Sequence, residues 1–412
     1  MNSVPPDRAS ACRGGTTTRD PPTAADAGEF SLVLGGPLYQ LLLRTRLARP
    51  PFDLLERRIV VITLVAWLPL LVLSVLEGRA FGGGGIPFLR DPDAQVRLLV
   101  ALPLLILAEK IIHERLRPAV RLFVEKGLVR PEDRPRFDAI VASTMRWRNS
   151  VILELGLVAF VFTVAHTLWA AALALQGETW FVRPTDAGRG LSRAGLWYAW
   201  ISLPIFQFIL FRWWYRLLLW CGFLFRVSRL DLDLSPSNPD RAGGLGFLGT
   251  STAAFAPLLV AQSALVSAMV GSRILHQGAQ LQDFKLELGG ALVFCLLQAF
   301  GPLVVFAPSL LQAKRRGLHD YGLLADRYVK DFERKWIRGG PAPHEPLVGS
   351  ADIQSLCDLD GSFTVIREMR PFPFGREAVI PLVATIVLPG LPLVLTVIPL
   401  EDLVKRLLGA LL

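Results

Sequence analysis

Long apolar blocks alternate with charged segments along this chain, and the length of the blocks predicts the fold. A helix needs about 20 apolar residues to cross the ~30 Å hydrocarbon core of a bilayer. Six blocks qualify or nearly qualify: 59–76, 98–112, 151–175, 196–225, 253–275 and 288–311. We therefore predict an all-α fold, a polytopic transmembrane helical bundle of six to seven spans with a small helical cytoplasmic region.

The seventh block, residues 378–399, is long enough to cross but is interrupted by Pro381, Pro389, Gly390 and Pro392. Two alternatives follow from these breaks, a full crossing or a re-entrant hairpin that is buried in protein. We favour the full crossing, and the hairpin stays open as the alternative.

The segments outside the blocks differ in character. Residues 1–28 are polar and rich in Pro, Thr and Arg, which predicts a disordered N-terminal tail. Residues 29–58 combine apolar and basic positions, which predicts an interfacial amphipathic helix. Apolar positions recur every three or four residues in two stretches of 312–377, the expected cytoplasmic helical region. Residues 400–412 are expected to form a C-terminal amphipathic tail.

Composition excludes other classes of protein. The chain has 412 residues, of which 52% are hydrophobic and 19% charged, whereas soluble domains carry about a quarter charged residues. This excludes an ordinary soluble enzyme and a disordered chain. The cysteines occur singly, at Cys12, Cys221, Cys295 and Cys357, so we expect no disulfide framework, no metal site and no cofactor.

The net charge of +9 does not indicate nucleic-acid binding, because no base-reading pattern accompanies it. The distribution of the basic residues instead predicts how the chain is oriented in the membrane. Segments 113–150 and 312–377 are dense in Lys and Arg, whereas segments 77–97 and 176–195 hold few. Basic loops stay on the cytoplasmic side. We therefore predict a cytoplasmic N-terminus and contact between the basic segments and anionic lipid headgroups.

Ionisable residues inside spans are the best pointers to function, because burying one in hydrocarbon is costly unless it is paired or hydrated. Arg212 and Arg216 lie four residues apart on one helix face. In the interpretation that we favour, they extend to headgroups at the end of a crossing. In the alternative, they line a polar cavity or pair with Glu109 and Glu154, and an anion or proton pathway follows. The candidates for a polar path or intramembrane pairing are Glu109, Lys110, His113, Glu154, His166, Arg212 and Arg216.

Two of these candidates have their own alternatives. His166 lies on an apolar face and is expected to be a hydrogen-bonded packing residue rather than a haem ligand. Glu109 and His113 are one helical turn apart, but no further metal ligand can be placed beside them. We predict a paired structural group there and no metal.

A glycine-rich loop precedes the fifth span. Gly244, Gly246 and Gly249 match G-x-G-x-x-G, but a membrane span follows, where a dinucleotide fold would need a soluble helix. We favour a capped, sharply bent helix start. The alternative is an anion or lipid headgroup held by the loop amides. The residues concerned are Arg241, Gly243, Gly244, Gly246 and Thr250.

Small residues recur at four-residue intervals in the fifth span, at Ser263, Ser267 and Gly271. Such a stripe allows a neighbouring helix to approach closely, so it predicts tight helix packing or a homo-oligomer. Nucleophile-elbow and P-loop patterns do not occur in the sequence. No sequence motif therefore predicts an enzymatic activity.

The stretches 88–97, 239–247 and 352–358 resemble segments of an uncharacterised bacterial multi-pass inner-membrane protein family of unknown function. The resemblance covers most of the chain after the N-terminal tail. It implies a location in the bacterial inner membrane and implies no activity or ligand.

Two functional hypotheses follow from these patterns. The first is a transporter or channel-like protein with a polar path through the bundle. The second is a non-transporting scaffold or sensor whose basic cytoplasmic helices bind lipid headgroups or a protein partner. A water-filled cavity that reaches Arg212 or Glu154 would favour the first, and a dry interior with a basic cytoplasmic surface would favour the second.

Overall fold

The computed structural model of the protein describes residues 30–45, 54–82, 85–167, 179–185, 188–339 and 350–394. Apart from a short β-hairpin, the regular elements in this part of the chain are helices, which confirms the all-α prediction. The tails predicted at residues 1–28 and 400–412 lie outside the described residues.

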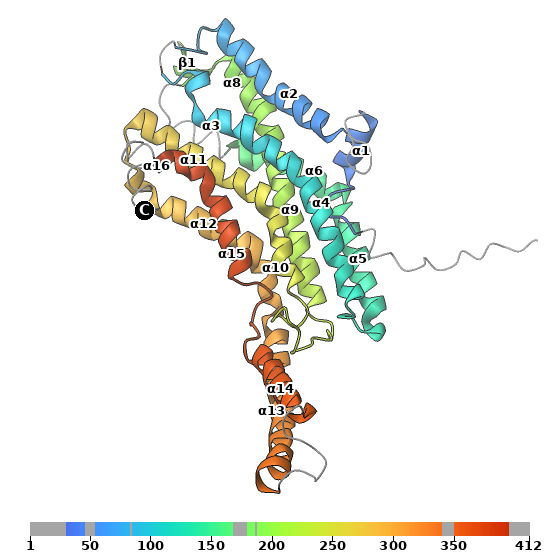
Figure 1. Ribbon diagram of the computed structural model, residues 1–412. Helices are drawn as coiled ribbons and strands as arrows, with labels where there is room; N and C mark the ends of the chain where they lie inside the picture. The colour runs from blue at the N-terminus through green and yellow to red at the C-terminus, as the bar shows by residue number, and fades with distance from the viewer. Residues whose placement is uncertain are drawn as a thin grey trace, which may run out of the picture.

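The elements follow one another in a simple order (Figure 1). The helices up to the hairpin are α1 Pro37–Arg44, α2 Leu55–Leu76, α3 Pro92–Gln95, α4 Leu102–Glu125, α5 Arg134–Arg148 and α6 Val151–Phe160. The strands are β1 Val182–Thr185 and β2 Gly188–Leu191. The later helices are α8 Arg193–Trp197, α9 Leu203–Val227, α10 Phe247–Ser251, α11 Ala256–Gln277, α12 Lys285–Phe300, α13 Ala307–Phe332, α14 Ala351–Arg367, α15 Arg376–Val387 and α16 Leu391–Val394.

Several helical stretches of the described chain are long and apolar enough to cross a membrane. There are five of them by length and composition, or six if the bent pair 131–148 and 151–165 forms one span. The five are Leu55–Leu76, Arg193–Val227, Phe247–Gln277, Leu281–Arg338 and Arg376–Val394. The protein is therefore a multi-span helical membrane protein.

The central helix of the bundle combines α3, a π-helical segment Val96–Ala101 and α4. Asp91 begins it, because its carboxylate accepts hydrogen bonds from the amides of Asp93 (3.1 Å) and Ala94 (3.4 Å). This helix contains the predicted span 98–112, but its charged residues keep it outside the five stretches above. It packs against α2, α9 and α11, which makes it the core of the bundle rather than a lipid-facing helix.

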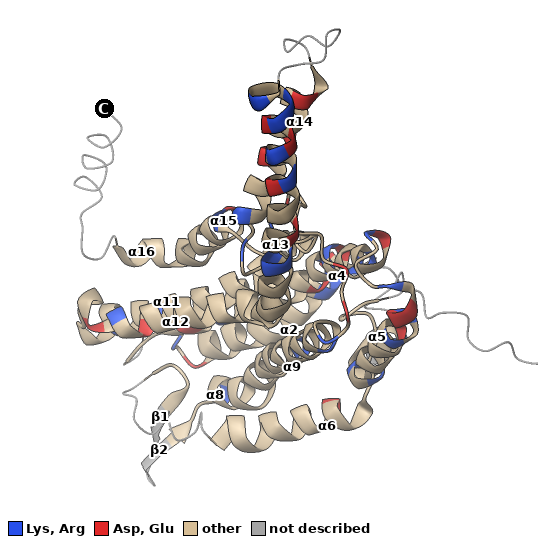
Figure 2. Ribbon diagram, turned by 90° about the horizontal axis from the view of Figure 1, so that it is seen from below, with Lys and Arg blue, Asp and Glu red and all other residues tan. Residues whose placement is uncertain are grey.

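The helices around this core expose apolar side chains. Ile152 of α6 is 82% exposed and Leu286 of α12 is 89% exposed. Figure 2 shows that α2, α6, α11 and α12 carry few charged residues along their length. Monomeric soluble proteins rarely expose apolar surface of this extent, so these helices contact the lipid bilayer.

An arm formed by α13 and α14 projects from one end of the bundle (Figure 1). The two helices are antiparallel: Lys314 bonds the Met369 carbonyl (2.8 Å), and Tyr328 bonds the Asp352 carbonyl (3.0 Å). Figure 2 shows that Lys, Arg, Asp and Glu are concentrated on this arm. The arm accounts for most of the helical region predicted at 312–377.

The opposite end of the bundle carries the β-hairpin, in which Val182 pairs with Leu191. Trp180, just before the hairpin, packs edge-on against Phe88 with a centroid distance of 4.9 Å. Its indole nitrogen also donates to Asp91 (2.9 Å). These contacts anchor the hairpin to the start of the central helix.

The small-residue stripe of α11 packs against the last helices of the chain. Ser263 donates to the Ile386 carbonyl (2.5 Å), and a Cβ on Gly271 would lie 3.3 Å from Leu393. The described stretch 376–394 is one helical run that continues past Pro389. Within it the chain does not turn back, and residues 395–399 of the seventh block lie outside the described part. The stripe therefore contacts a helix of the same chain, and a homo-oligomer stays a prediction.

Candidate functional site

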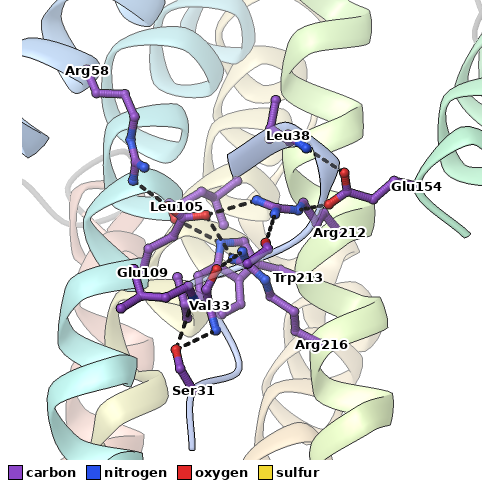
Figure 3. A network of polar contacts seen from close by, with 12 residues as sticks. Ser31, Val33, Leu38, Arg58, Leu105, Glu109, Glu154, Arg212, Trp213 and Arg216 are labelled. Atoms are coloured by element: carbon purple, nitrogen blue, oxygen red, sulfur yellow. Dashed lines mark hydrogen bonds and ion pairs between the residues drawn. The ribbon is translucent and has the colours of Figure 1, made fainter. Parts of the chain in front are cut away.

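Six charged side chains gather inside the bundle, and Figure 3 labels all of them but Arg148. They come from five helices, α2, α4, α5, α6 and α9, and all six are buried. We call this group the arginine–glutamate cluster. Its members are Arg58, Glu109, Arg148, Glu154, Arg212 and Arg216.

Glu109 is the centre of the cluster. Its Oε1 accepts hydrogen bonds from Arg216 (2.9 Å) and Arg212 (3.3 Å), and its Oε2 accepts one from Arg58. The Nε of Arg212 also donates to Glu154 (3.0 Å). Because Arg212 and Arg216 share one face of α9, a single helix supplies two of the donors to Glu109, and Arg212 alone joins the two carboxylates.

These contacts are those expected when the arginines are paired, and not those expected when they extend to headgroups. Arg212 is 6% and Arg216 is 3% exposed. Arg216 also lies over the ring of Trp213 at 4.8 Å, and the Trp213 indole donates to the Leu105 carbonyl (2.8 Å). Stacking and hydrogen bonding of this kind fix the guanidinium and partly offset its desolvation.

The cluster carries an excess of positive charge. Its four arginines face two glutamates, so its formal charge is +2. An unpaired buried charge costs several kcal/mol, and therefore the excess must be met by other oxygen atoms. The chain itself supplies them.

Residues 30–36 run through the inside of the bundle as a non-helical segment that bends at 32–34, which we call the strap. The carbonyl of Ser31 accepts from Arg148, that of Val33 from Arg216 (3.2 Å), and that of Gly35 from Arg212 (3.3 Å). Figure 3 shows the strap passing between α4 and α9. Main-chain carbonyl oxygens therefore accept hydrogen bonds from the arginine N–H groups that the two glutamates do not contact.

Side chains on both sides of the cluster hold the strap in place. The ring of Phe30 lies 5.1 Å from that of Phe223. Ser31 Oγ lies 2.8 Å from Nδ1 of His113. At the other end, the amide of Leu38 donates to Glu154 (2.7 Å). The strap is thus connected to three of the helices that form the cluster.

The strap differs from the interfacial amphipathic helix expected over residues 29–58. Only Pro37–Arg44 is helical before α2, residues 30–36 are non-helical and largely buried, and residues 46–53 are outside the described part. Two glycines explain the difference. Gly35 and Gly36 have φ of 144° and 91°, a region that other L-residues rarely adopt.

Space at these glycines is equally restricted. A Cβ on Gly35 would lie 2.4 Å from Asn149 Oδ1, and a Cβ on Gly36 would lie 2.8 Å from Glu154 Oε1. Only glycine allows the backbone to pass this close to the cluster. The adjacent glycines are a feature of the sequence that could have indicated the strap. A search for periodic apolar positions does not detect them.

The remaining predicted polar residues fall in different places. Lys110 is exposed on α4, one residue from Glu109. His113 joins the site through Ser31. His166 lies 4.8 Å from the ring of Trp200, twelve residues beyond Glu154 and so roughly 18 Å along the helix. His166 is therefore remote from the arginine–glutamate cluster.

The glycine-rich loop binds a carboxylate of its own chain. Asp240 accepts hydrogen bonds from the amides of Ala242 (2.8 Å), Gly244 (3.1 Å) and Gly246 (2.9 Å). Arg241 forms an ion pair with Glu368 at the base of the arm (3.0 Å). Thr250 donates back to its own helix at the Phe247 carbonyl (3.0 Å), and Gly243 packs beside Met369. An external anion would have to replace Asp240, so anion binding here stays a prediction.

A second polar group lies at the other end of the central helix. Arg97 donates to Tyr198 (2.5 Å) and to Asp93 (2.7 Å). Beside the arginine–glutamate cluster, a small pocket of about 20 Å³ reaches Arg58, Glu109, Arg212 and Arg216. It is also lined by apolar residues, Leu38, Ile62, Ile106 and Ile209. The volume holds about one water molecule, so this pocket is not the wide water-filled cavity that the first hypothesis expects at Arg212.

Sequence reasoning missed Arg58, Arg148 and the strap carbonyls. Both arginines lie in segments dense in basic residues, where nothing distinguishes a buried arginine from one that faces headgroups. Within the described ranges, no group of three or more His, Cys, Asp or Glu residues is placed to hold a metal ion.

Comparison with family models, with curated proteins and with solved structures finds no significant match to this chain. The family resemblance noted in the sequence therefore stays a prediction. The helical spans and the buried charge network are the observations from which a function can be argued.

Proposed function

We propose that this protein is a transporter or channel-like membrane protein that carries a small anion along a polar path through the arginine–glutamate cluster. The observation that carries the proposal is the excess of buried positive charge, +2 over six side chains. A buried ion network that served only stability would gain nothing from a net charge that only neutral carbonyl oxygens meet. Ionisable groups at such positions mark ion and substrate pathways in membrane proteins.

The position of the cluster supports a path. The central helix carries the Arg97 group toward one end and Glu109 further along, and Ile62, Ile106 and Ile209 line the small pocket beside Glu109. Apolar constrictions gate channels by excluding water. The pocket holds about one water molecule, so the proposal requires the path to widen during transport.

Location and orientation belong to the same proposal. We place the protein in the bacterial inner membrane with the arm and the N-terminus on the cytoplasmic side. The support is the density of Lys and Arg in 113–150 and 312–377. Both segments flank the end of the bundle from which the arm projects (Figure 1).

The experiment is a flux assay in liposomes that contain the purified full chain, with protons, chloride, phosphate and a dicarboxylate tested separately. We expect anion flux that Arg212→Gln reduces at least tenfold. The matched control is Arg146→Gln, since Arg146 is exposed on α5 and its loss should leave flux unchanged. Absence of flux for every probe from folded protein, together with copurification of one partner, would overturn the proposal.

The arm supports the second candidate, a scaffold or sensor. Its helices project beyond the bundle and carry Lys and Arg together with Asp and Glu (Figure 2). Leu324 and Ile337 are exposed there, at 51% and 70%. Such a surface suits a protein partner or lipid headgroups. This function requires no flux, so the liposome assay separates the two candidates.

A further inference from the structure

The strap contacts the cluster through three main-chain carbonyls. Its bonded carbonyls belong to Ser31, Val33 and Gly35, which meet the cluster although the chain bends at residues 32–34, where the amides of Val33 and Leu34 donate to Ser31 Oγ. The donors that they meet come from Arg148, Arg216 and Arg212. Three oxygen atoms of the strap therefore face three guanidinium groups.

These oxygens are weak partners for the donors they meet. A main-chain carbonyl is neutral and carries only a partial negative charge, whereas guanidinium groups bond carboxylate and phosphate oxygens more strongly and often through two bonds at once. The donors at Arg212 and Arg216 that are turned to the strap are the ones that Glu109 and Glu154 do not use. An anion placed there would compensate the excess charge that the strap leaves.

We propose that the strap occupies a binding site for an oxyanion, a ligand with carboxylate or phosphate groups, and that strap and ligand exclude each other. The inference rests on the proposed function and adds the ligand class and the present occupant of the site. Arg212 and Arg216 each turn one donor to the strap. Two guanidinium groups side by side suit a ligand with two anionic ends, such as a short dicarboxylate.

The exchange requires the strap to leave while the bundle stays folded. It precedes the eight-residue helix α1, and the central helix α4 also packs directly against α2, α9 and α11. Phe30, Leu32 and Val33 are buried, so the strap stays in the site in the absence of ligand. A site that is open only part of the time binds its ligand with a correspondingly lower apparent affinity.

The first test locks the strap. Ser31 Oγ contacts His113 Nδ1 (2.8 Å), so Ser31→Cys with His113→Cys places two thiols on facing positions, and mass spectrometry verifies the disulfide before binding is measured. The four native cysteines are replaced by serine in this variant. Binding of succinate and of inorganic phosphate is measured separately by calorimetry on the full chain. We expect the oxidised form to bind at least tenfold more weakly than the same sample after reduction.

The second test releases the strap. Gly36→Val introduces a side chain where a Cβ already lies 2.8 Å from Glu154 Oε1, and we expect the apparent affinity for succinate to rise at least tenfold. Gly156→Ala is the matched control, because a Cβ there meets nothing within 4 Å. Maleimide labelling of Ser31→Cys in each background verifies release, since Ser31 is buried when the strap is in place.

The source of the oxyanion is resolved by a lipid comparison. The same variants are placed in vesicles of phosphatidylglycerol or of phosphatidylcholine without added succinate or phosphate. Faster labelling of Ser31→Cys in phosphatidylglycerol alone assigns the site to a lipid headgroup. Faster labelling only upon addition of succinate or phosphate assigns it to a soluble ligand, and either result supports the exchange.

The outcomes separate this inference from the proposed function. Equal affinity in the oxidised and reduced forms, or no binding when labelling shows that the strap has left, overturns the exchange. Anion flux that persists with the strap locked overturns it as well and leaves the transport proposal standing. Strap-dependent binding without flux in liposomes supports the exchange and overturns transport.

Discussion

Replacement of Glu109 by glutamine tests whether one carboxylate holds the cluster together. The change keeps the shape of the side chain and removes its charge. Arg58 and Arg216 lose their carboxylate partner, whereas Arg212 keeps Glu154. Loss of one partner from a buried ion pair costs about 3–5 kcal/mol, because it leaves the other charge buried without compensation. We expect the free energy of unfolding to fall by an amount in this range.

The assay is equilibrium denaturation in detergent micelles, followed by tryptophan fluorescence. Glu114→Gln is the matched control, since Glu114 is exposed on the same helix, and it should change stability by less than about 0.5 kcal/mol. The double variant of Glu109→Gln with Arg216→Gln should recover part of the loss, because it removes an uncompensated charge. A loss below about 1 kcal/mol for Glu109→Gln would refute the reasoning and indicate that water or another group neutralises the arginines.

Three further predictions concern the strap, the glycine-rich loop and the arm. Gly36→Val should lower stability, and Gly156→Ala should not, in thermal unfolding, since only the first side chain meets neighbouring atoms. Asp240→Ala should cost about 1–3 kcal/mol and speed hydrogen exchange of the loop amides, which lose their acceptor. Hydrogen bonds from Lys335 and Trp336 lower the pKa of Asp352 from its usual 3.8. Its stabilising contacts are therefore present at neutral pH and lost as the pH falls below that value, which exchange rates in the arm should report.

Length and hydropathy of the blocks determined the class of fold from the sequence. A block of 20 apolar residues has few structural alternatives, because a backbone in hydrocarbon must satisfy its hydrogen bonds internally. The helix Leu55–Leu76 is a clear case, since the predicted span 59–76 lies wholly within it. Charge also indicated which residues were unusual, and Glu109, Glu154, Arg212 and Arg216 were singled out on that ground.

The sequence left the choice between paired and headgroup-facing arginines open, and the preference for headgroups did not match the structure. An arginine near the end of an apolar block has the same local sequence in either case. Its partner, Glu109, lies 103 residues from Arg212. Only the packing of α4 against α9 decides that the two meet.

The strap is a second feature that the local sequence did not predict. Its sequence is apolar and precedes a short helix, so periodicity predicted a surface element. The carbonyls of Val33 and Gly35 carry no signal in the amino-acid letters, because every residue has one. Their role depends on Arg212 and Arg216, which are 177 and 183 residues away. Local sequence thus determined that this chain spans a membrane. The tertiary structure alone decided which charged side chains lie together in its interior, because compensation of a buried charge depends on distance in space and not along the chain.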